Sequence, residues 1–158
     1  ASVLPSTLAS TFKVYLPVTA RPAQAIEGKV VDAVRGGTET ILLAEDEESI
    51  LNLAAEILTE AGYTVFTASD GEAALDLFET HADNIDLVFL DAVMPRLGGY
   101  DLQKRIRATH PDTRFLFTSG YSAQALHTNF VIQEGLQFIQ KPYSHDMLLR
   151  KVRDVLDG

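Results

Sequence analysis

The sequence contains no cysteine, which excludes disulfide bonds and thiolate metal sites. It also lacks a stripe rich in lysine and arginine, since 13 basic residues stand against 22 acidic ones and the net charge is −9. Nucleic-acid surfaces need clustered basic residues to neutralise phosphates, so we expect no nucleic-acid partner. No apolar run approaches the ~20 residues that cross a bilayer. The opening "ASVLPSTLAS" has neither the basic start nor the apolar core of a secretory signal. We therefore expect a cytoplasmic chain with no membrane contact of its own, even if a longer parent protein is membrane-anchored.

Two zones separate near residue 38. A chain of 158 residues is long enough for one well-buried domain with an appendage. Residues 11–18, "TFKVYLPV", alternate apolar and polar side chains, which predicts a short strand closed by proline. Residues 19–37 contain proline and paired glycines and indicate a linker. We therefore assign residues 1–38 to a strand with a linker and residues 39–158 to the domain.

From residue 39 onward, short apolar runs alternate with segments of helical periodicity. Strands are expected at 40–46, 63–69, 85–91, 114–120 and 137–142, and helices at 47–62, 70–82, 99–110, 122–135 and 144–158. Strands this apolar must be covered on both faces, and right-handed crossovers then require a mainly parallel, doubly wound sheet. The sequence thus predicts an α/β fold of five strands and five helices. Its functional groups are expected at the carboxyl ends of the strands.

Polar side chains follow four of the expected strands. The first strand ends in Glu45 and Asp46, the third in Asp91, the fourth in Ser119 and the fifth in Lys141. Carboxylates gathered at one edge repel each other, and their pKa values rise unless a cation lies among them. Oxygen ligands of this kind suit Mg²⁺. The set therefore predicts an acid that reacts, a dication that binds phosphoryl oxygens, and a lysine and hydroxyl that hold the remaining oxygens.

Each of these residues also has a simpler interpretation. Asp46 is suited to capping the following helix. Lys141, which precedes a proline, could be a solvated charge, and Ser119 before glycine could be turn chemistry. Their joint occurrence at four strand exits is not explained by capping alone, so we keep the functional interpretation.

Four motifs occur in the order that a known family shows: "ILLAEDE", "LVFLDAVMPRLGGYDL", "FLFTSGY" and "FIQKPYS". With these motifs, residues 39–157 resemble the receiver domain of two-component response regulators. The resemblance implies a flavodoxin-like fold with strand order 2-1-3-4-5 and an N-terminal extra strand outside it. It also implies a partner that is a histidine kinase or a histidine phosphotransfer domain.

The resemblance assigns the phosphoacceptor and the metal ligands. Asp91 would be the nucleophile that takes a phosphoryl group from phosphohistidine to form an aspartyl phosphate. Asp46 and Asp91 would bind Mg²⁺ through their side chains and Val93 through its backbone carbonyl, and Mn²⁺ could substitute. Glu45, the other member of the acidic pair, would contribute through water. The pair departs from the family's pattern in being Glu-Asp rather than two aspartates. The proline and paired glycines after Val93 would shape the adjoining loop.

The resemblance also assigns residues that hold, sense and shield the phosphoryl group. Ser119 and Lys141 would contact its oxygens. Phe138 would be the aromatic switch that turns inward when Ser119 moves. Val93 and Tyr121 flank the path of a hydrolytic water, and neither is a base, so we expect slow loss of the phosphoryl group.

The segment "STFKVYLPV" resembles the terminal strand of a histidine-kinase ATP-binding domain. This resemblance implies that the chain is the C-terminal receiver of a hybrid histidine kinase, with a kinase remnant in residues 1–38. The chain lacks the glycine-rich ATP lid of a kinase, so we expect it to be a phosphoacceptor and not an enzyme in itself. We expect a monomer or a weak dimer.

Three alternatives stay open at this point. A haloacid-dehalogenase-type phosphatase also uses a strand-end aspartate with Mg²⁺, but it needs an acid where this chain has Val93. A pseudo-receiver would have the fold without phosphorylation. A stand-alone regulator would need an output domain, and the sequence after the last helix offers none.

Overall fold

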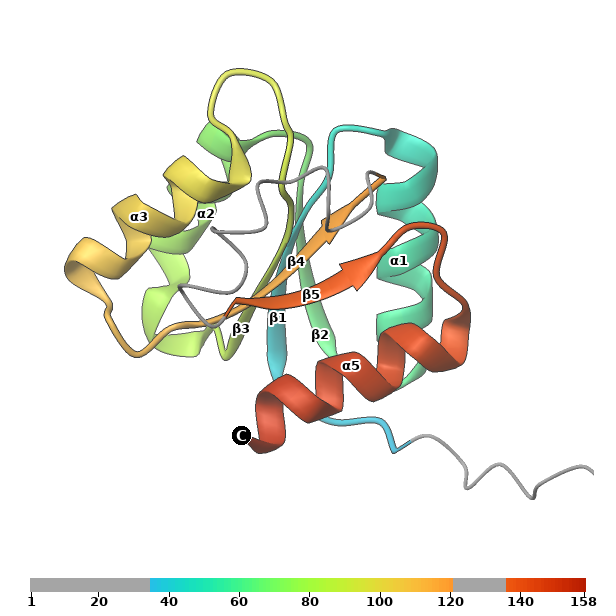
Figure 1. Cartoon of the computed structure of the whole chain (residues 1–158). Helices are drawn as coiled ribbons and strands as arrows, with labels where there is room; N and C mark the ends of the chain where they lie inside the picture. Colours follow the sequence, from blue (N-terminus) through green and yellow to red (C-terminus); the bar gives the residue numbers. More distant parts are fainter. Residues whose placement is uncertain (1–34, 121–135) are drawn as a thin grey trace, which may run out of the picture. The chain divides into compact units, whose positions relative to one another are not determined.

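The structure, a computed structural model, describes residues 35–120 and 136–158 (Figure 1). The strands are β1 (Thr40–Ala44), β2 (Thr64–Ala68), β3 (Leu87–Asp91), β4 (Arg114–Ser119) and β5 (Gln137–Gln140). The helices are α1 (Glu48–Glu60), α2 (Gly71–His81), α3 (Gly99–Thr109) and α5 (His145–Asp157), with a short 3₁₀ helix η1 (Ala82–Asn84). The strand expected at 11–18 and the helix expected at 122–135 lie outside the described residues. Among the described helices, none is both long enough and apolar enough to cross a bilayer.

The five strands form one parallel sheet in the order β2-β1-β3-β4-β5 (Figure 1). This confirms the predicted doubly wound fold and its strand order. The chain adds β2 on one side of β1 and β3 on the other, so the winding direction reverses between β1 and β3. In such folds ligands bind at the carboxyl ends of the strands beside this reversal. A ligand site is therefore expected at the loops after β1 and β3.

Both faces of the sheet are covered by helices, as Figure 1 shows, with α1 and α5 on one face and α2 and α3 on the other. Successive residues of β1 point to opposite faces: Ile41 and Leu43 pack under α1 and α5, whereas Leu42 and Ala44 pack under α2 and α3. All residues of β3 are buried. Each large apolar side chain buried in this way stabilises the fold by roughly 1.5–3 kcal/mol. The two-sided burial explains why these strands are apolar throughout.

Strands β1 and β5 each end two residues earlier than the sequence predicts, and β2 and β4 each end one residue earlier. The pairing of β1 with β2 ends at Ala44 and Ala68, and only the backbone N–H of Glu45 still donates to the Ala68 carbonyl, at 3.1 Å. Strand β5 ends at Gln140, so Lys141 lies in the following loop, where its peptide bond to Pro142 is cis. Glu45, Asp46 and Lys141 therefore lie in the loops just beyond their strands, whereas Asp91 and Ser119 are the last residues of β3 and β4.

The first residues of the helices test the interpretation of Asp46 as a helix cap. Residue Glu47 occupies the N-cap position of α1 and its side chain makes no capping hydrogen bond. The interpretation of Asp46 as the cap is therefore wrong, because α1 begins one residue too late for it. By contrast, the carboxylate of Asp70 caps α2, and the hydroxyl of Ser144 caps α5.

Candidate functional site

Three carboxylates meet at the carboxyl edge of the sheet. Glu45 and Asp46 come from the loop after β1, and Asp91 is the last residue of β3. One oxygen of each lies within 4.8 Å of an oxygen of the other two. Glu45 and Asp91 are buried, with 2% and 8% of their surface exposed, while Asp46 is exposed. The adjacent acids Glu45 and Asp46 are far from Asp91 in the sequence and are brought close to it because β1 and β3 are neighbours in the sheet.

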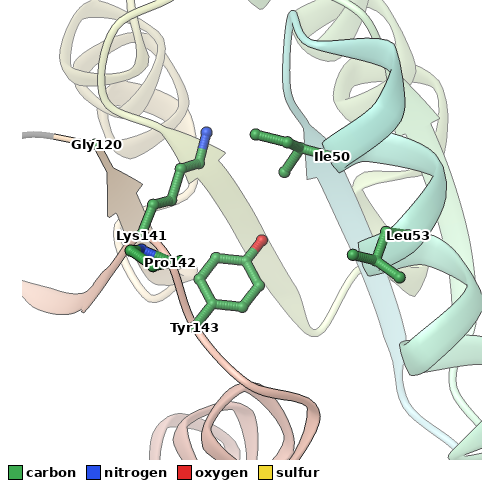
Figure 2. A pocket seen from close by; sticks show the side chains of 6 residues that line it. All are labelled: Ile50, Leu53, Gly120, Lys141, Pro142 and Tyr143. Atoms are coloured by element: carbon green, nitrogen blue, oxygen red, sulfur yellow. The ribbon is translucent and has the colours of Figure 1, made fainter. Parts of the chain in front are cut away.

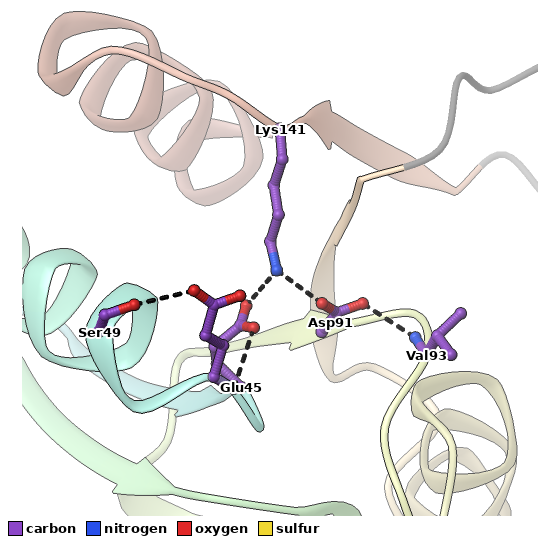
Figure 3. Close-up of polar contacts among 6 residues, drawn as sticks. Glu45, Ser49, Asp91, Val93 and Lys141 are labelled. Atoms are coloured by element: carbon purple, nitrogen blue, oxygen red, sulfur yellow. Dashed lines mark hydrogen bonds and ion pairs between the residues drawn. The ribbon is translucent and has the colours of Figure 1, made fainter. Parts of the chain in front are cut away.

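Lys141 joins two of these carboxylates. Its ammonium donates to Glu45 Oε2 at 2.5 Å and to Asp91 Oδ2 at 2.6 Å (Figure 3). The side chain reaches the site from the loop after β5 and is only 14% exposed. The interpretation of Lys141 as a solvated charge is therefore wrong. An ammonium with two charge-assisted hydrogen bonds is instead a fixed part of the site.

Burial and hydrogen bonding shift the pKa values of Glu45 and Lys141. Burial raises the pKa of the Glu45 carboxyl, and the hydrogen bond from Lys141 opposes this shift without cancelling it. Burial alone would lower the pKa of Lys141, but its hydrogen bonds to Asp91 and Glu45 outweigh burial and leave the pKa raised. Lys141 is therefore a cation at neutral pH. Three carboxyl groups face one ammonium in this cluster, and such an acidic set of oxygen ligands suits a divalent cation.

The backbone around Asp91 holds its carboxylate in place. Asp91 Oδ1 accepts a hydrogen bond from the Val93 N–H at 2.9 Å (Figure 3). The next residue, Ala92, donates from its N–H to the Thr118 carbonyl at 2.9 Å, which ties this loop to β4. Helix α3 begins at Gly99 so close to Asp91 that a Cβ there would lie 2.3 Å from the Asp91 carbonyl oxygen. The glycine is needed for this approach.

Among the other residues singled out from the sequence, Ser119, Phe138 and Val93 belong to the described part of the chain. Ser119 is the last residue of β4, and its side chain is outside what the structure describes, as is the whole of Tyr121. Phe138 is half-buried on β5, and its ring stacks on Phe117 with centroids 6.0 Å apart. Val93 lies beside Asp91 with 57% of its surface exposed.

An apolar pocket of about 410 Å³ lies beside Lys141 (Figure 2). Its described lining consists of Ile50 and Leu53 from α1, Gly120, and the loop residues Lys141, Pro142 and Tyr143. Leu53 is 57% exposed. Burial, followed by the negative charge of Glu45, raises the pKa of Tyr143 to about 12, so its phenol is protonated at neutral pH. The site thus combines a charged cluster with an exposed apolar surface.

The residues missed from the sequence are Asp70 and Arg96. The Asp70 carboxylate is 2% exposed and forms an ion pair with Arg96, which lies in the loop between β3 and α3. The pair Asp70-Gly71 signals a helix start and an acidic cap. No local pattern connects it with an arginine 26 residues later. Only the packing of α2 against this loop reveals the pair.

The chain is similar in sequence to a known protein family and to characterised proteins. A family model, the response regulator receiver domain, matches residues 41–153. The sensor kinase CckA of Brucella abortus (strain 2308) is 35% identical over 156 residues, covering 94% of this chain and 16% of that protein. The transcriptional regulatory protein CpxR of Escherichia coli (strain K12) is 34% identical over 117 residues, covering 73% of this chain and 48% of CpxR.

A solved structure shows the same fold. The crystal structure of the receiver domain from the hybrid histidine kinase CckA matches with a TM-score of 0.63 and 33% identity, covering 74% of this chain and 98% of that one. The chain spans less than half of either full-length relative. Because the family model covers most of the chain and the sheet has the family's order, the chain belongs to the response regulator receiver domains of two-component systems.

Proposed function

We propose that Asp91 is the phosphoacceptor of this receiver domain and takes a phosphoryl group from a phosphohistidine. The observation that carries the proposal is the fixed carboxylate of Asp91 at the sheet edge. Lys141 binds one of its oxygens and the Val93 N–H binds the other, with two further carboxylates within 4.8 Å. Phosphoryl transfer depends on positioning and charge neutralisation more than on acid–base chemistry. The described groups supply both.

In the transfer step, an Asp91 oxygen attacks phosphorus and the phosphorus–nitrogen bond of the donor breaks. The electron pair of that bond leaves with the imidazole, and no proton needs to move at Asp91. The ammonium of Lys141 carries three hydrogens, of which two are donated to Glu45 and Asp91. The third is available for a phosphoryl oxygen, where its positive charge opposes the negative charge of the transferring group.

The acidic cluster fits Mg²⁺, which would neutralise phosphoryl oxygens when bound. Oxygens bound directly to one Mg²⁺ lie about 4.2 Å apart at most, given Mg–O distances near 2.1 Å. The three carboxylates meet within 4.8 Å, which is close to this limit and compatible with a mixture of direct ligands and ligands that bind through water. Glu45 is the most buried of the three acids, with 2% of its surface exposed against 8% for Asp91, while Asp46 is exposed. We therefore assign direct binding to Asp46 and Asp91, with the Val93 carbonyl, and the water-mediated place to Glu45; Mn²⁺ has the same ligand preference.

The remaining assignments concern what happens after transfer. We assign the Ser119 hydroxyl to a phosphoryl oxygen and Phe138 to the conformational switch. The exposed Val93 side chain beside Asp91, together with Tyr121, would hinder a hydrolytic water and make the aspartyl phosphate long-lived. The support is the exposure of Val93 and the fact that neither residue is a base.

The chain itself is modified rather than catalytic, and we assign it to a hybrid histidine kinase. A match over 94% of 158 residues takes in about 149 of them, whereas residues 39–158 supply only 120. The match to the sensor kinase therefore extends some 29 residues or more into the segment before residue 39. This supports the assignment of residues 1–38 to a kinase remnant and linker. Some relatives are transcriptional regulators, so the expected absence of a nucleic-acid partner stays a prediction.

A phosphohistidine donor must bring its histidine to Asp91 and so must cover the surface around Lys141. Two apolar residues of α1, the exposed Leu53 and the half-buried Ile50, line the pocket beside Lys141 (Figure 2). We assign this surface to the histidine kinase or phosphotransfer partner.

Phosphorylation by a small donor tests the central assignment. The protein is incubated with Mg²⁺ and acetyl phosphate, and intact-mass spectrometry measures the addition of one phosphoryl group. We expect the addition in the wild type and in the control Asp76→Asn, an exposed aspartate on α2, but not in Asp91→Asn. A wild type that gains no mass with this donor or with the phosphorylated parent kinase would identify a pseudo-receiver instead.

A further inference from the structure

The loop between β3 and α3 contains a residue in an unusual backbone conformation. Arg96 has a φ of 64°, in the left-handed region that L-residues other than glycine rarely adopt. The Leu97 N–H donates to the Pro95 carbonyl at 2.8 Å, so Arg96 is the central residue of a γ-turn with positive φ. This is the rarer and more strained form of the γ-turn. Such a conformation persists only where the surrounding contacts require it.

Two contacts with the start of α2 hold Arg96 in this conformation. The Arg96 guanidinium is paired with Asp70 Oδ2, while Asp70 Oδ1 accepts the Glu72 and Ala73 N–H groups at 2.9 and 3.0 Å. One residue on, the Leu97 carbonyl lies so close to α2 that a Cβ on Gly71 would be 2.0 Å from its oxygen. The loop is therefore held against the N-terminus of α2 at two successive residues.

The other end of this loop reaches the phosphoacceptor. Val93 donates its N–H to Asp91 Oδ1, and α3 starts in contact with the Asp91 backbone. Between these points Met94 and Leu97 are buried, with 8% and 6% of their surface exposed. A loop fixed at Asp70 and at Asp91 has little freedom to reorient Val93.

We propose that the Asp70–Arg96 pair is a positioning device for the Asp91 loop. It holds Arg96 in its strained turn and so keeps the Val93 N–H on the Asp91 carboxylate and the Val93 carbonyl beside it. Asp70 and Arg96 touch neither the metal nor the donor in this role. The inference deepens the proposed function and rests on the assignment of Asp91 and Val93 to the metal-dependent site.

Two substitutions separate positioning from simple stabilisation. Arg96→Gly removes the guanidinium and at the same time relieves the left-handed conformation, which glycine adopts freely. Asp70→Asn keeps an oxygen that can cap α2 but removes the charge that pairs with Arg96. Arg96→Lys keeps a cationic donor and serves as the conservative variant. Arg105→Ala, an exposed arginine on α3, is the control for loss of one positive charge.

The first measurement uses the metal-free protein. We expect faster amide hydrogen exchange at Val93 and Leu97 in Arg96→Gly and Asp70→Asn than in the wild type and Arg105→Ala. Exchange in β1 and β3 should be unchanged, with partial recovery in Arg96→Lys. The second measurement is the Mn²⁺ dissociation constant, by electron paramagnetic resonance, which should rise about tenfold in both variants, as for other residues that support metal ligands. The Mn²⁺ dissociation constant of the double variant should be no higher than that of either single variant, because the two residues act as a pair.

The results distinguish the possible failures. Altered thermal stability with unchanged exchange at Val93 and an unchanged Mn²⁺ constant would overturn the inference and leave the pair as a helix cap only. If wild-type protein neither bound Mn²⁺ nor accepted phosphate, the proposed function would fail. The exchange at Val93 would still decide whether the pair positions the loop.

Discussion

Lys141 donates a hydrogen bond to Asp91 over 2.6 Å, although the two residues are 50 positions apart in the chain. The same ammonium binds Glu45, which is 96 positions away. The parallel sheet makes this contact possible because it brings the loops after β1, β3 and β5 to one edge. An ammonium held between two carboxylates can also bind the phosphoryl group once it is on Asp91. Removal of this ammonium should therefore lower the rate of phosphoryl transfer more than the stability of the fold.

Replacing Lys141 tests whether its ammonium assists phosphoryl transfer. Lys141→Met keeps much of the side-chain length and removes the charge, so we expect phosphorylation by acetyl phosphate to slow roughly 100-fold, comparable to losing one preorganised donor elsewhere. Intact-mass spectrometry over time gives the rate. Lys151→Met is the control, because Lys151 is a lysine of α5 that bonds only Gln137 among the described residues, at 2.7 Å. Equal rates in the two variants would contradict a role for Lys141 in transfer.

Metal binding should separate the two adjacent acids. Asp46→Asn removes a proposed direct ligand and should weaken Mn²⁺ binding more than Glu45→Gln does. We expect about a tenfold weakening for Glu45→Gln, as for residues that act beyond the bound ligands. Mn²⁺ titration followed by electron paramagnetic resonance gives both constants, with the exposed Glu48→Gln as control. The reverse order of effects would place Glu45 in direct contact with the metal.

Loss of the phosphoryl group should accelerate when the flanking residues can orient water. Val93→Asn combined with Tyr121→Glu replaces bulky groups that are not bases with groups that hydrogen-bond a water beside Asp91. We expect dephosphorylation at least roughly tenfold faster, since a positioned polar group commonly contributes more than that. The decay of phosphorylated protein after removal of the donor measures the rate. An unchanged decay would rule out shielding by these two side chains.

Contact with a protein donor should depend on the apolar surface on α1. Leu53→Asp places a charge on an exposed leucine that lines the pocket beside Lys141. Transfer from the phosphorylated parent kinase should slow about tenfold, as expected when a buried apolar contact is lost from an interface. Phosphorylation by acetyl phosphate should keep its wild-type rate. Equal effects on both donors would mean that the substitution damages the site rather than docking.

Stability should depend on pH through Glu39, at the start of the domain. Arg153 donates to Glu39 Oε1 at 2.6 Å, and this hydrogen bond lowers the pKa of the Glu39 carboxyl. A lowered pKa in the folded state stabilises the protein above the pKa of the unfolded state. That contribution is lost as the pH falls through the folded value. Glu39→Gln should therefore cost about 0.5–1 kcal/mol at neutral pH and progressively less in acid.

Urea denaturation at a series of pH values measures this difference. Glu56→Gln, an exposed glutamate on α1, is the control and should change stability little at any pH. A deficit in Glu39→Gln that stayed constant into acid would show that the pair with Arg153 is not its cause.

The sequence by itself determined the elements and the edge at which they present their polar groups. The burial of β1 after its first residue and the unbroken burial of β3 follow from local apolar patterns, and these patterns predicted the strands and the described helices. The strand order was implied by the resemblance to receiver domains. The acids at the ends of β1 and β3 were recognised in the same way, because an apolar run that stops at a carboxylate marks the end of a buried strand. Their types and positions were enough to indicate a phosphoryl and metal site.

Only the tertiary structure decided which of these groups touch. Asp46 looked equally suited to capping until α1 was seen to begin after Glu47, and Lys141 looked solvated until it was seen between Glu45 and Asp91. No local sequence pattern predicted the ion pair between Asp70 and Arg96. The physical reason is that periodicity reports which face of an element is buried. Hydrogen bonds between loops depend on where the crossovers place chain segments far apart in sequence, to within an ångström.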